Sequence, residues 1–230
     1  MKTAFVGGAT GYTGREVVRQ LAEQGVRVVA HVRPDSGRLA EWRERFSAMG
    51  AEVSTAAWEL GAMTEELTRL CPEVVFALLG TTKKRGATTG DSYESVDYGL
   101  SALLLKAAEG SGVAPLFVYL SAAGVSDTAK GGYYGARARV EGLLRDSALS
   151  SVIARPSFIT GPDRDESRPG ERIGATVSDA LLTTLSWVGA RRLKERYRST
   201  SNVELARALV RAAPTPNEKM LILESEDLRS

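Results

Sequence analysis

The chain has 230 residues, of which 43% are hydrophobic and 25% charged, and its formal net charge is +2. This length suits one large hydrophobic core, so we expect a single domain over residues 1–230. A nearly neutral charge without basic blocks does not indicate nucleic-acid binding, and no apolar stretch is long enough to span a membrane. The lone Cys71 cannot form an internal disulfide, and the first residues lack a signal-peptide pattern, so the sequence predicts a cytoplasmic protein.

Short apolar runs alternate with amphipathic segments along the whole chain. The apolar runs are residues 3–7, 26–32, 52–57, 73–79, 116–121, 151–154 and 219–224. The amphipathic segments are residues 15–25, 40–49, 64–70, 96–112, 135–149 and 202–213. Near-continuous apolar runs are typical of strands buried on both faces. Their alternation with helices predicts an α/β fold with a parallel sheet covered on both sides.

The first predicted strand leads directly into GGATGYTGREVVRQL, where Gly8, Gly11 and Gly14 lie three residues apart. Glycines allow a tight turn and let a pyrophosphate approach bare N–H groups, while the N-terminus of the following helix attracts negative charge. A glycine-rich turn without a ligand is the alternative. The preceding strand and the following amphipathic helix favour a dinucleotide site. The other residues of this cofactor-binding turn are Thr10, Tyr12 and Thr13.

The end of the second predicted strand, HVRPD, is the place where proteins of this kind distinguish NAD from NADP. An acid here would hold the ribose 2′-hydroxyl of NAD, whereas an arginine would receive the 2′-phosphate of NADP. Arg33 occupies this place, and a planar guanidinium matches phosphate oxygens. The sequence therefore predicts NADPH in preference to NADH. The only histidine, His31, lies in the apolar pattern of the strand and is expected to be a packed core residue.

Residues 132–141, GYYGARARVE, place Tyr133 four positions before Arg137 at the start of a predicted helix. Residues at i and i+4 share a face of a helix, so both head groups can meet one ligand. The pair is either a proton donor beside a fixed cation or an ordinary surface pair. The stretch alone leaves both interpretations open.

Several strings together resemble one known group of proteins. They are GGATGYTG, LGTTKKRG, LSAAG, the Tyr133 and Arg137 pair, ARPSFITG and, most specifically, DRDESRPGE. These resemble the atypical short-chain dehydrogenase/reductases, with the closest likeness to the Tat-interacting oxidoreductase branch and its NmrA-like NADP-binding relatives. The resemblance implies a Rossmann-like, doubly wound parallel sheet flanked by helices on both faces. It also implies NADPH binding and a Tyr-x-x-x-Lys catalytic pair.

Carried over by position, the resemblance places Leu79, Gly80 and Thr81 against the adenosine half of the cofactor. Tyr133 takes the place of the proton donor, and Arg168 falls in a loop that the family folds over the cofactor.

Two positions depart from the family pattern. Arg137 stands where the family has lysine, and LSAAG offers Ser121 as the assisting hydroxyl but has Ala122 where relatives often carry a second serine. These residues leave two classes of function open. The first is an NADPH-dependent oxidoreductase acting on a small carbonyl compound, and the second is a non-catalytic NADPH-binding sensor or regulatory protein.

The remaining expectations concern the C-terminal part and possible partners. Residues 158–200 are expected to form a small substrate or lid portion, with the charged loop 161–172 closing over the cofactor. No metal site is predicted. The substrate is expected to be a small molecule, and the sequence leaves a monomer and a dimer equally open.

Overall fold

The computed structural model describes residues 1–81, 90–157, 159–160, 199–213 and 219–229. Seven strands form one sheet in the order β3-β2-β1-β4-β5-β6-β9, and every neighbouring pair is parallel. The bounds are Thr3–Gly7 (β1), Arg27–His31 (β2), Glu52–Ser54 (β3), Val74–Ala77 (β4), Leu116–Leu120 (β5), Ser151–Arg155 (β6) and Met220–Glu224 (β9). The order reverses between β1 and β4, which is where doubly wound folds bind ligands. The predicted Rossmann-like sheet is confirmed.

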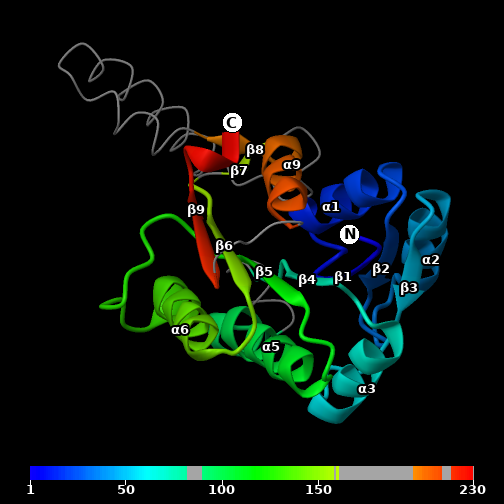
Figure 1. Cartoon of the computed structure of the whole chain (residues 1–230), viewed down its shortest axis with the longest axis horizontal. Helices are drawn as coiled ribbons and strands as arrows, with labels where there is room; N and C mark the ends of the chain where they lie inside the picture. Colours follow the sequence, from blue (N-terminus) through cyan, green and yellow to red (C-terminus); the bar gives the residue numbers. More distant parts are fainter. Residues whose placement is uncertain (82–89, 158, 161–198, 214–218, 230) are drawn as a thin grey trace.

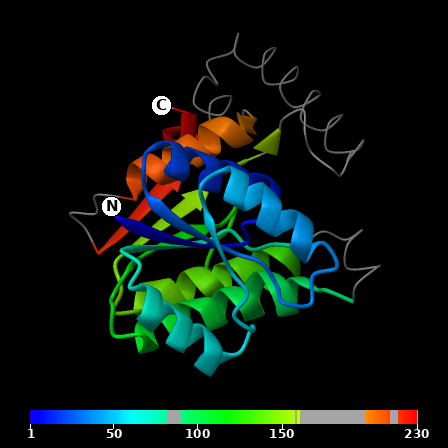
Figure 2. The same ribbon diagram turned by 90° about the vertical axis from the view of Figure 1, so that its right-hand side faces the viewer.

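Helices cover both faces of this sheet (Figures 1 and 2). One face carries α1 (Tyr12–Glu23), α2 (Leu39–Ala48) and α9 (Asn202–Ala212). The opposite face carries α3 (Leu60–Leu70), α5 (Ser101–Gly110) and α6 (Gly132–Asp146). A short 3-10 helix, η3 (Asp227–Arg229), follows β9.

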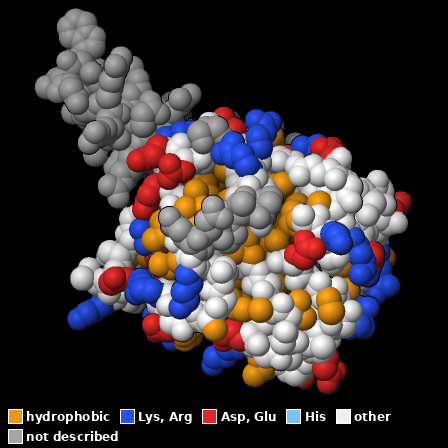
Figure 3. All heavy atoms as spheres, in the orientation of Figure 1, with side chains coloured by type: hydrophobic (Ala, Val, Ile, Leu, Met, Phe, Trp, Pro, Cys, Tyr) orange, Lys and Arg blue, Asp and Glu red, His pale blue; other side chains and the backbone are white. Residues whose placement is uncertain are grey.

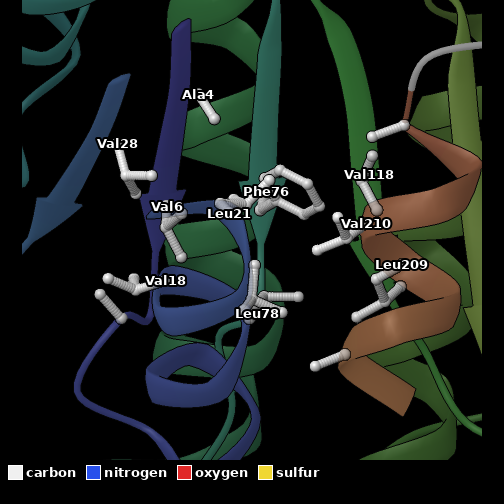
Figure 4. Close-up of a cluster of buried hydrophobic side chains, with 14 of the residues drawn as sticks. Ala4, Val6, Val18, Leu21, Val28, Phe76, Leu78, Val118, Leu209 and Val210 are labelled. Carbon is white, nitrogen blue, oxygen red and sulfur yellow. The ribbon is translucent and has the colours of Figure 1, made fainter. Parts of the chain in front are cut away.

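Side-chain alternation along the strands explains the two layers. Val6 of β1 packs in the cluster with α1 and α9, whereas its neighbour Phe5 packs in the cluster with α3 and α5. Successive residues of a strand point to opposite faces, so a run that is apolar throughout buries both of them. Figure 4 shows the first cluster, in which Phe76 and Val118 of the sheet face Leu21 and Leu209 of the helices.

Two features were not predicted from the sequence. The segment expected to form one helix over residues 96–112 begins as a π-helix, η1 (Tyr93–Leu100), which continues directly into α5. A second, two-stranded sheet pairs β7 (Ile159–Thr160) with β8 (Thr200–Ser201) in parallel. Most of the predicted lid, including the loop 161–172, lies outside the described residues, so its expected role stays a prediction.

Candidate functional site

The turn between β1 and α1 has the geometry of an anion site. Gly8 adopts φ +80°, and a Cβ there would lie 2.5 Å from the Leu78 carbonyl oxygen, so only glycine fits. A Cβ on Gly14 would overlap the backbone of Gly8. The N-cap of α1, Gly11, provides no side-chain cap, and the first turn contains no acidic residue. A helix N-terminus of this kind is suited to an anionic ligand such as a pyrophosphate.

This turn opens into a hollow at the carboxyl ends of β1, β2 and β4. Its empty space is about 570 Å³ when the open, solvent-filled mouth is included. The hollow brings together most of the predicted cofactor residues, although they come from three separate segments. The predicted residues that line it are Gly8, Thr10, Gly11, Arg33, Leu79 and Gly80. Thr13 and Gly14 are buried in the first turn of α1 behind it, as is the hydroxyl of Tyr12.

Two aromatic side chains line the hollow between β2 and the segment after β3. The rings of His31 and Trp58 meet edge to face with centroids 4.7 Å apart, and His31 Nε2 lies 2.8 Å from the Ala56 carbonyl oxygen. His31 is 3% exposed, which confirms it as a packed residue, and burial lowers its pKa. Trp58 was missed from the sequence because it lies in a loop whose position relative to β2 follows only from the sheet.

Arg33 follows β2 at the same edge of the sheet. Its side chain is 40% exposed, and its Nε lies 3.8 Å from Asp35 Oδ1, an acid that is itself 76% exposed. Exposed pairs of this kind contribute only about 0–1 kcal/mol. The ion pair with Asp35 is therefore weak and leaves Arg33 partly exposed to solvent. The guanidinium remains accessible to a phosphate.

The segment after β4 joins the hollow to the predicted catalytic pair. Leu79 and Gly80 line the hollow, and a Cβ on Gly80 would lie 2.9 Å from Arg137 Nη2. Thr81 is 8% exposed, and its hydroxyl is buried and has no hydrogen-bond partner within the described part of the chain. A buried, unpaired hydroxyl is costly unless a ligand completes it. Its position beside the hollow fits the predicted contact with a cofactor.

Arg137 is fully enclosed and points into the sheet. Its Nη2 donates to the Leu79 carbonyl at 3.1 Å and to Asp97 Oδ1 at 2.8 Å, and its Nη1 donates to the Leu120 carbonyl. Its side chain is 5% exposed. Both terminal nitrogens are thus engaged with protein acceptors at the ends of β4 and β5. Through these contacts Arg137 links α6 to the ends of β4 and β5 and to Asp97.

Tyr133 lies half-buried one helical turn from Arg137, and the guanidinium carbon is 5.2 Å from the centroid of its ring. The ring also meets Tyr93 and Tyr134 edge to face, with centroids 5.4 and 5.3 Å away. The other phenol near Arg137, Tyr119, is wholly enclosed, and burial raises its pKa to about 12. Of the two tyrosines beside the cation, Tyr133 is therefore the one that a substrate can reach.

Ser121 lies at the end of β5 in a different network. Its hydroxyl donates to Glu141 at 2.5 Å, and the two carboxylate oxygens of Glu141 also accept from Arg155 at 3.1 and 2.6 Å. Arg155 in turn pairs with Glu224 at 3.0 Å, which links β6, β9 and α6. The structure therefore directs the Ser121 hydroxyl to a carboxylate on α6. Its predicted catalytic role stays a prediction, as does that of Arg168, which lies outside the described residues.

No group of metal-binding side chains occurs among the described residues. Within the same part of the chain, no helix combines the length and apolar character that crossing a membrane requires. Acidic and basic side chains are both distributed around the face shown in Figure 3.

A doubly wound sheet with a glycine turn and an open hollow at its switch point defines a dinucleotide-binding protein. The sequence also matches the model of the NAD(P)H-binding family over residues 8–183. The chain belongs to this family, which confirms the assignment to the atypical short-chain dehydrogenase/reductases and a nicotinamide cofactor.

The chain is also similar to individual proteins. The chain is 35% identical over 166 residues to the chloroplastic divinyl chlorophyllide a 8-vinyl-reductase of Oryza sativa subsp. indica, an alignment that covers 67% of the chain but only 39% of that protein. It is 25% identical over 234 residues to the mitochondrial protein fmp52 of Emericella nidulans, with 96% and 94% of the two chains covered. Among solved structures, the enzyme WbmH of Bordetella bronchiseptica in complex with NAD+ superposes with a TM-score of 0.68 at 22% identity, covering 98% of this chain and 76% of that one.

Proposed function

We propose that this protein is an NADPH-dependent oxidoreductase that reduces a small carbonyl compound, with Tyr133 as the proton donor. The observation that carries the proposal is the contact between the two halves of the site. Arg137 Nη2 donates to the carbonyl of Leu79, which lines the hollow, while the same guanidinium lies against the ring of Tyr133. The catalytic pair therefore adjoins the cofactor site.

Separate groups of residues bind the different parts of the cofactor. The glycine turn and the N-terminus of α1 accept the pyrophosphate, and Arg33 receives the 2′-phosphate of NADPH. Leu79 and Gly80 form the inner wall of the hollow, and Thr81 follows them directly with a buried hydroxyl that has no hydrogen-bond partner among the described residues. When bound, NADPH supplies the hydride for the reduction.

Tyr133 supplies the proton. Its phenol donates to the substrate oxygen as negative charge develops there, which is general acid catalysis. Arg137 lies beneath the ring as a permanent cation, because a guanidinium is not deprotonated in proteins. Burial acts to lower its pKa, but the interactions with its neighbours outweigh burial and the pKa is raised. A fixed positive charge close to the phenol stabilises negative charge on its oxygen after the proton has left.

One observation favours a second candidate, a non-catalytic NADPH-binding protein. The Ser121 hydroxyl is engaged with Glu141, and the terminal nitrogens of Arg137 are engaged with protein acceptors. Neither residue is free to assist a substrate in the way the family pattern implies. A non-catalytic sensor needs only to bind NADPH, for which the hollow and the glycine turn are sufficient.

A substrate screen distinguishes the two candidates. The purified protein is incubated with NADPH and a panel of aldehydes and ketones, and NADPH oxidation is followed by absorbance. The panel includes compounds with an activated carbon–carbon double bond, because the rice relative is named a vinyl reductase. We expect oxidation with at least one carbonyl compound. Tight NADPH binding without oxidation by any member of the panel would favour the sensor.

A further inference from the structure

Asp97 is a buried acid at the centre of the site. It lies in the π-helix η1, has no exposed surface, and stands between the end of β4 and helix α6. Burial raises the pKa of its carboxyl, while Arg137 and the N–H of Thr81 oppose that rise. Acids are rarely enclosed completely unless their oxygens are paired. The partners of Asp97 therefore indicate what it does.

Each carboxylate oxygen of Asp97 has a different partner. Oδ2 accepts from the backbone N–H of Thr81 at 2.9 Å, and Oδ1 accepts from Arg137 Nη2 at 2.8 Å. Thr81 belongs to the segment that follows β4 and adjoins the hollow, whereas Arg137 belongs to α6. One side chain thus ties the cofactor wall to the helix that carries the predicted proton donor.

A second ion pair between the same two elements provides a contrast. Arg139 of α6 meets Glu94 of η1 at 2.7 Å, but these side chains are 51% and 64% exposed, against 5% and 0% for Arg137 and Asp97. An exposed pair contributes little, whereas removing one partner of a buried pair leaves an uncompensated charge. The outer pair joins η1 to α6 at the surface, and neither of its residues lines the hollow.

We propose that Asp97 is a positioning residue, which fixes the segment 79–81 and the pair of Arg137 and Tyr133 relative to each other. The catalytic half of this inference rests on the proposed function. Through Arg137, Asp97 sets where the cation lies beneath the Tyr133 ring, and through the Thr81 N–H it sets the inner wall of the hollow. Asp97 therefore affects both cofactor affinity and turnover, although it contacts neither cofactor nor substrate.

The variant that tests this role is Asp97→Asn, which keeps the shape of the side chain. An amide has one acceptor oxygen in place of two, and its NH₂ group then faces a donor. Either the Thr81 contact or the Arg137 contact is lost. Glu94→Gln is the matched control because it removes the exposed pair between the same elements.

For each variant, NADPH affinity is measured by fluorescence titration, and turnover is expressed per NADPH-binding site. We expect Asp97→Asn to weaken NADPH binding roughly tenfold or more. Turnover at saturating NADPH should fall roughly 100-fold, the cost of misplacing a catalytic group by about 1 Å. Glu94→Gln should change neither quantity. A purely structural role would lower the melting temperature and the number of sites but leave affinity and turnover per site unchanged, and that result would overturn the inference.

The affinity measurement also separates this inference from the proposed function. If the wild-type protein binds NADPH but oxidises it with no substrate, the proposed function fails. Weaker binding by Asp97→Asn than by Glu94→Gln would then still support the anchoring of segment 79–81, and equal binding would overturn it.

Should Asp97→Asn not fold, the double variant Asp97→Asn with Arg137→Met provides the test, because it leaves no unpaired buried charge. We expect it to regain most of the wild-type melting temperature while NADPH binding stays roughly tenfold weaker, because segment 79–81 is no longer tied to α6. Recovery of wild-type NADPH affinity together with stability would show that the pair is only structural.

Discussion

The preference for NADPH depends on Arg33, and Arg33→Ala tests it. Within the described residues the guanidinium has an exposed ion pair with Asp35 at 3.8 Å, which is worth about 0–1 kcal/mol and costs little to break. A hydrogen bond to a charged group contributes about 1.5–3 kcal/mol. One such contact with the 2′-phosphate therefore gives a preference of roughly 10- to 100-fold for NADPH over NADH.

The assay is a fluorescence titration of wild type and Arg33→Ala with both cofactors at fixed ionic strength. NADPH affinity should fall by roughly 10- to 100-fold in the variant, while NADH affinity changes little. Arg43→Ala, a change in the neighbouring helix α2, serves as the control for a general loss of positive charge. Equal losses for NADPH and NADH, or an equal loss in the control, would refute the assignment of Arg33 to the 2′-phosphate.

Two further predictions follow from the turn and from the buried histidine. Gly14→Ala should abolish NADPH binding and lower the melting temperature, because its Cβ would overlap the Gly8 backbone, whereas Gly37→Ala, with open space around it, should change neither. Burial lowers the pKa of His31 from its ordinary 6.5. Below pH 6.5 the unfolded chain therefore binds a proton at His31 more readily than the folded protein does, which favours unfolding. Denaturant unfolding across this range should show stability falling as the pH drops through 6.5 towards the lowered pKa of the folded state. The fall should be absent from His31→Gln, and an identical pH dependence in the variant would contradict the assignment.

Local patterns were sufficient to predict the sheet and the glycine turn. The central strands β1, β4, β5 and β6 are short, largely apolar runs buried on both faces, and this leaves a signal in consecutive residues. The glycines are equally local, since the positive φ of Gly8 and the close approach to Leu78 exclude a side chain. Arg33 could be found because its distance from the turn is fixed by one helix and one strand.

The rest of the site depends on contacts between distant residues. Asp97 and Arg137 are 40 positions apart, and their pairing follows from the packing of η1 against α6. Trp58 reaches the hollow only because β3 lies beside β2. The burial of Arg137 was also not evident, because an arginine on an amphipathic helix usually faces solvent. Sequence spacing identified Tyr133 and Arg137 as a pair but gave no information on the acceptors around the cation.

The variant Tyr133→Phe tests whether Tyr133 donates the proton in a reduction by NADPH. The change removes only the phenol oxygen, so turnover should fall below detection while NADPH affinity stays within about twofold, since the lost interaction forms in the transition state. Tyr134→Phe is the matched control, because the neighbouring ring is 50% exposed and packs against Tyr133 without contacting Arg137 in any described interaction. It should retain activity. Undiminished turnover in Tyr133→Phe, measured with the same substrate and saturating NADPH, would contradict the account.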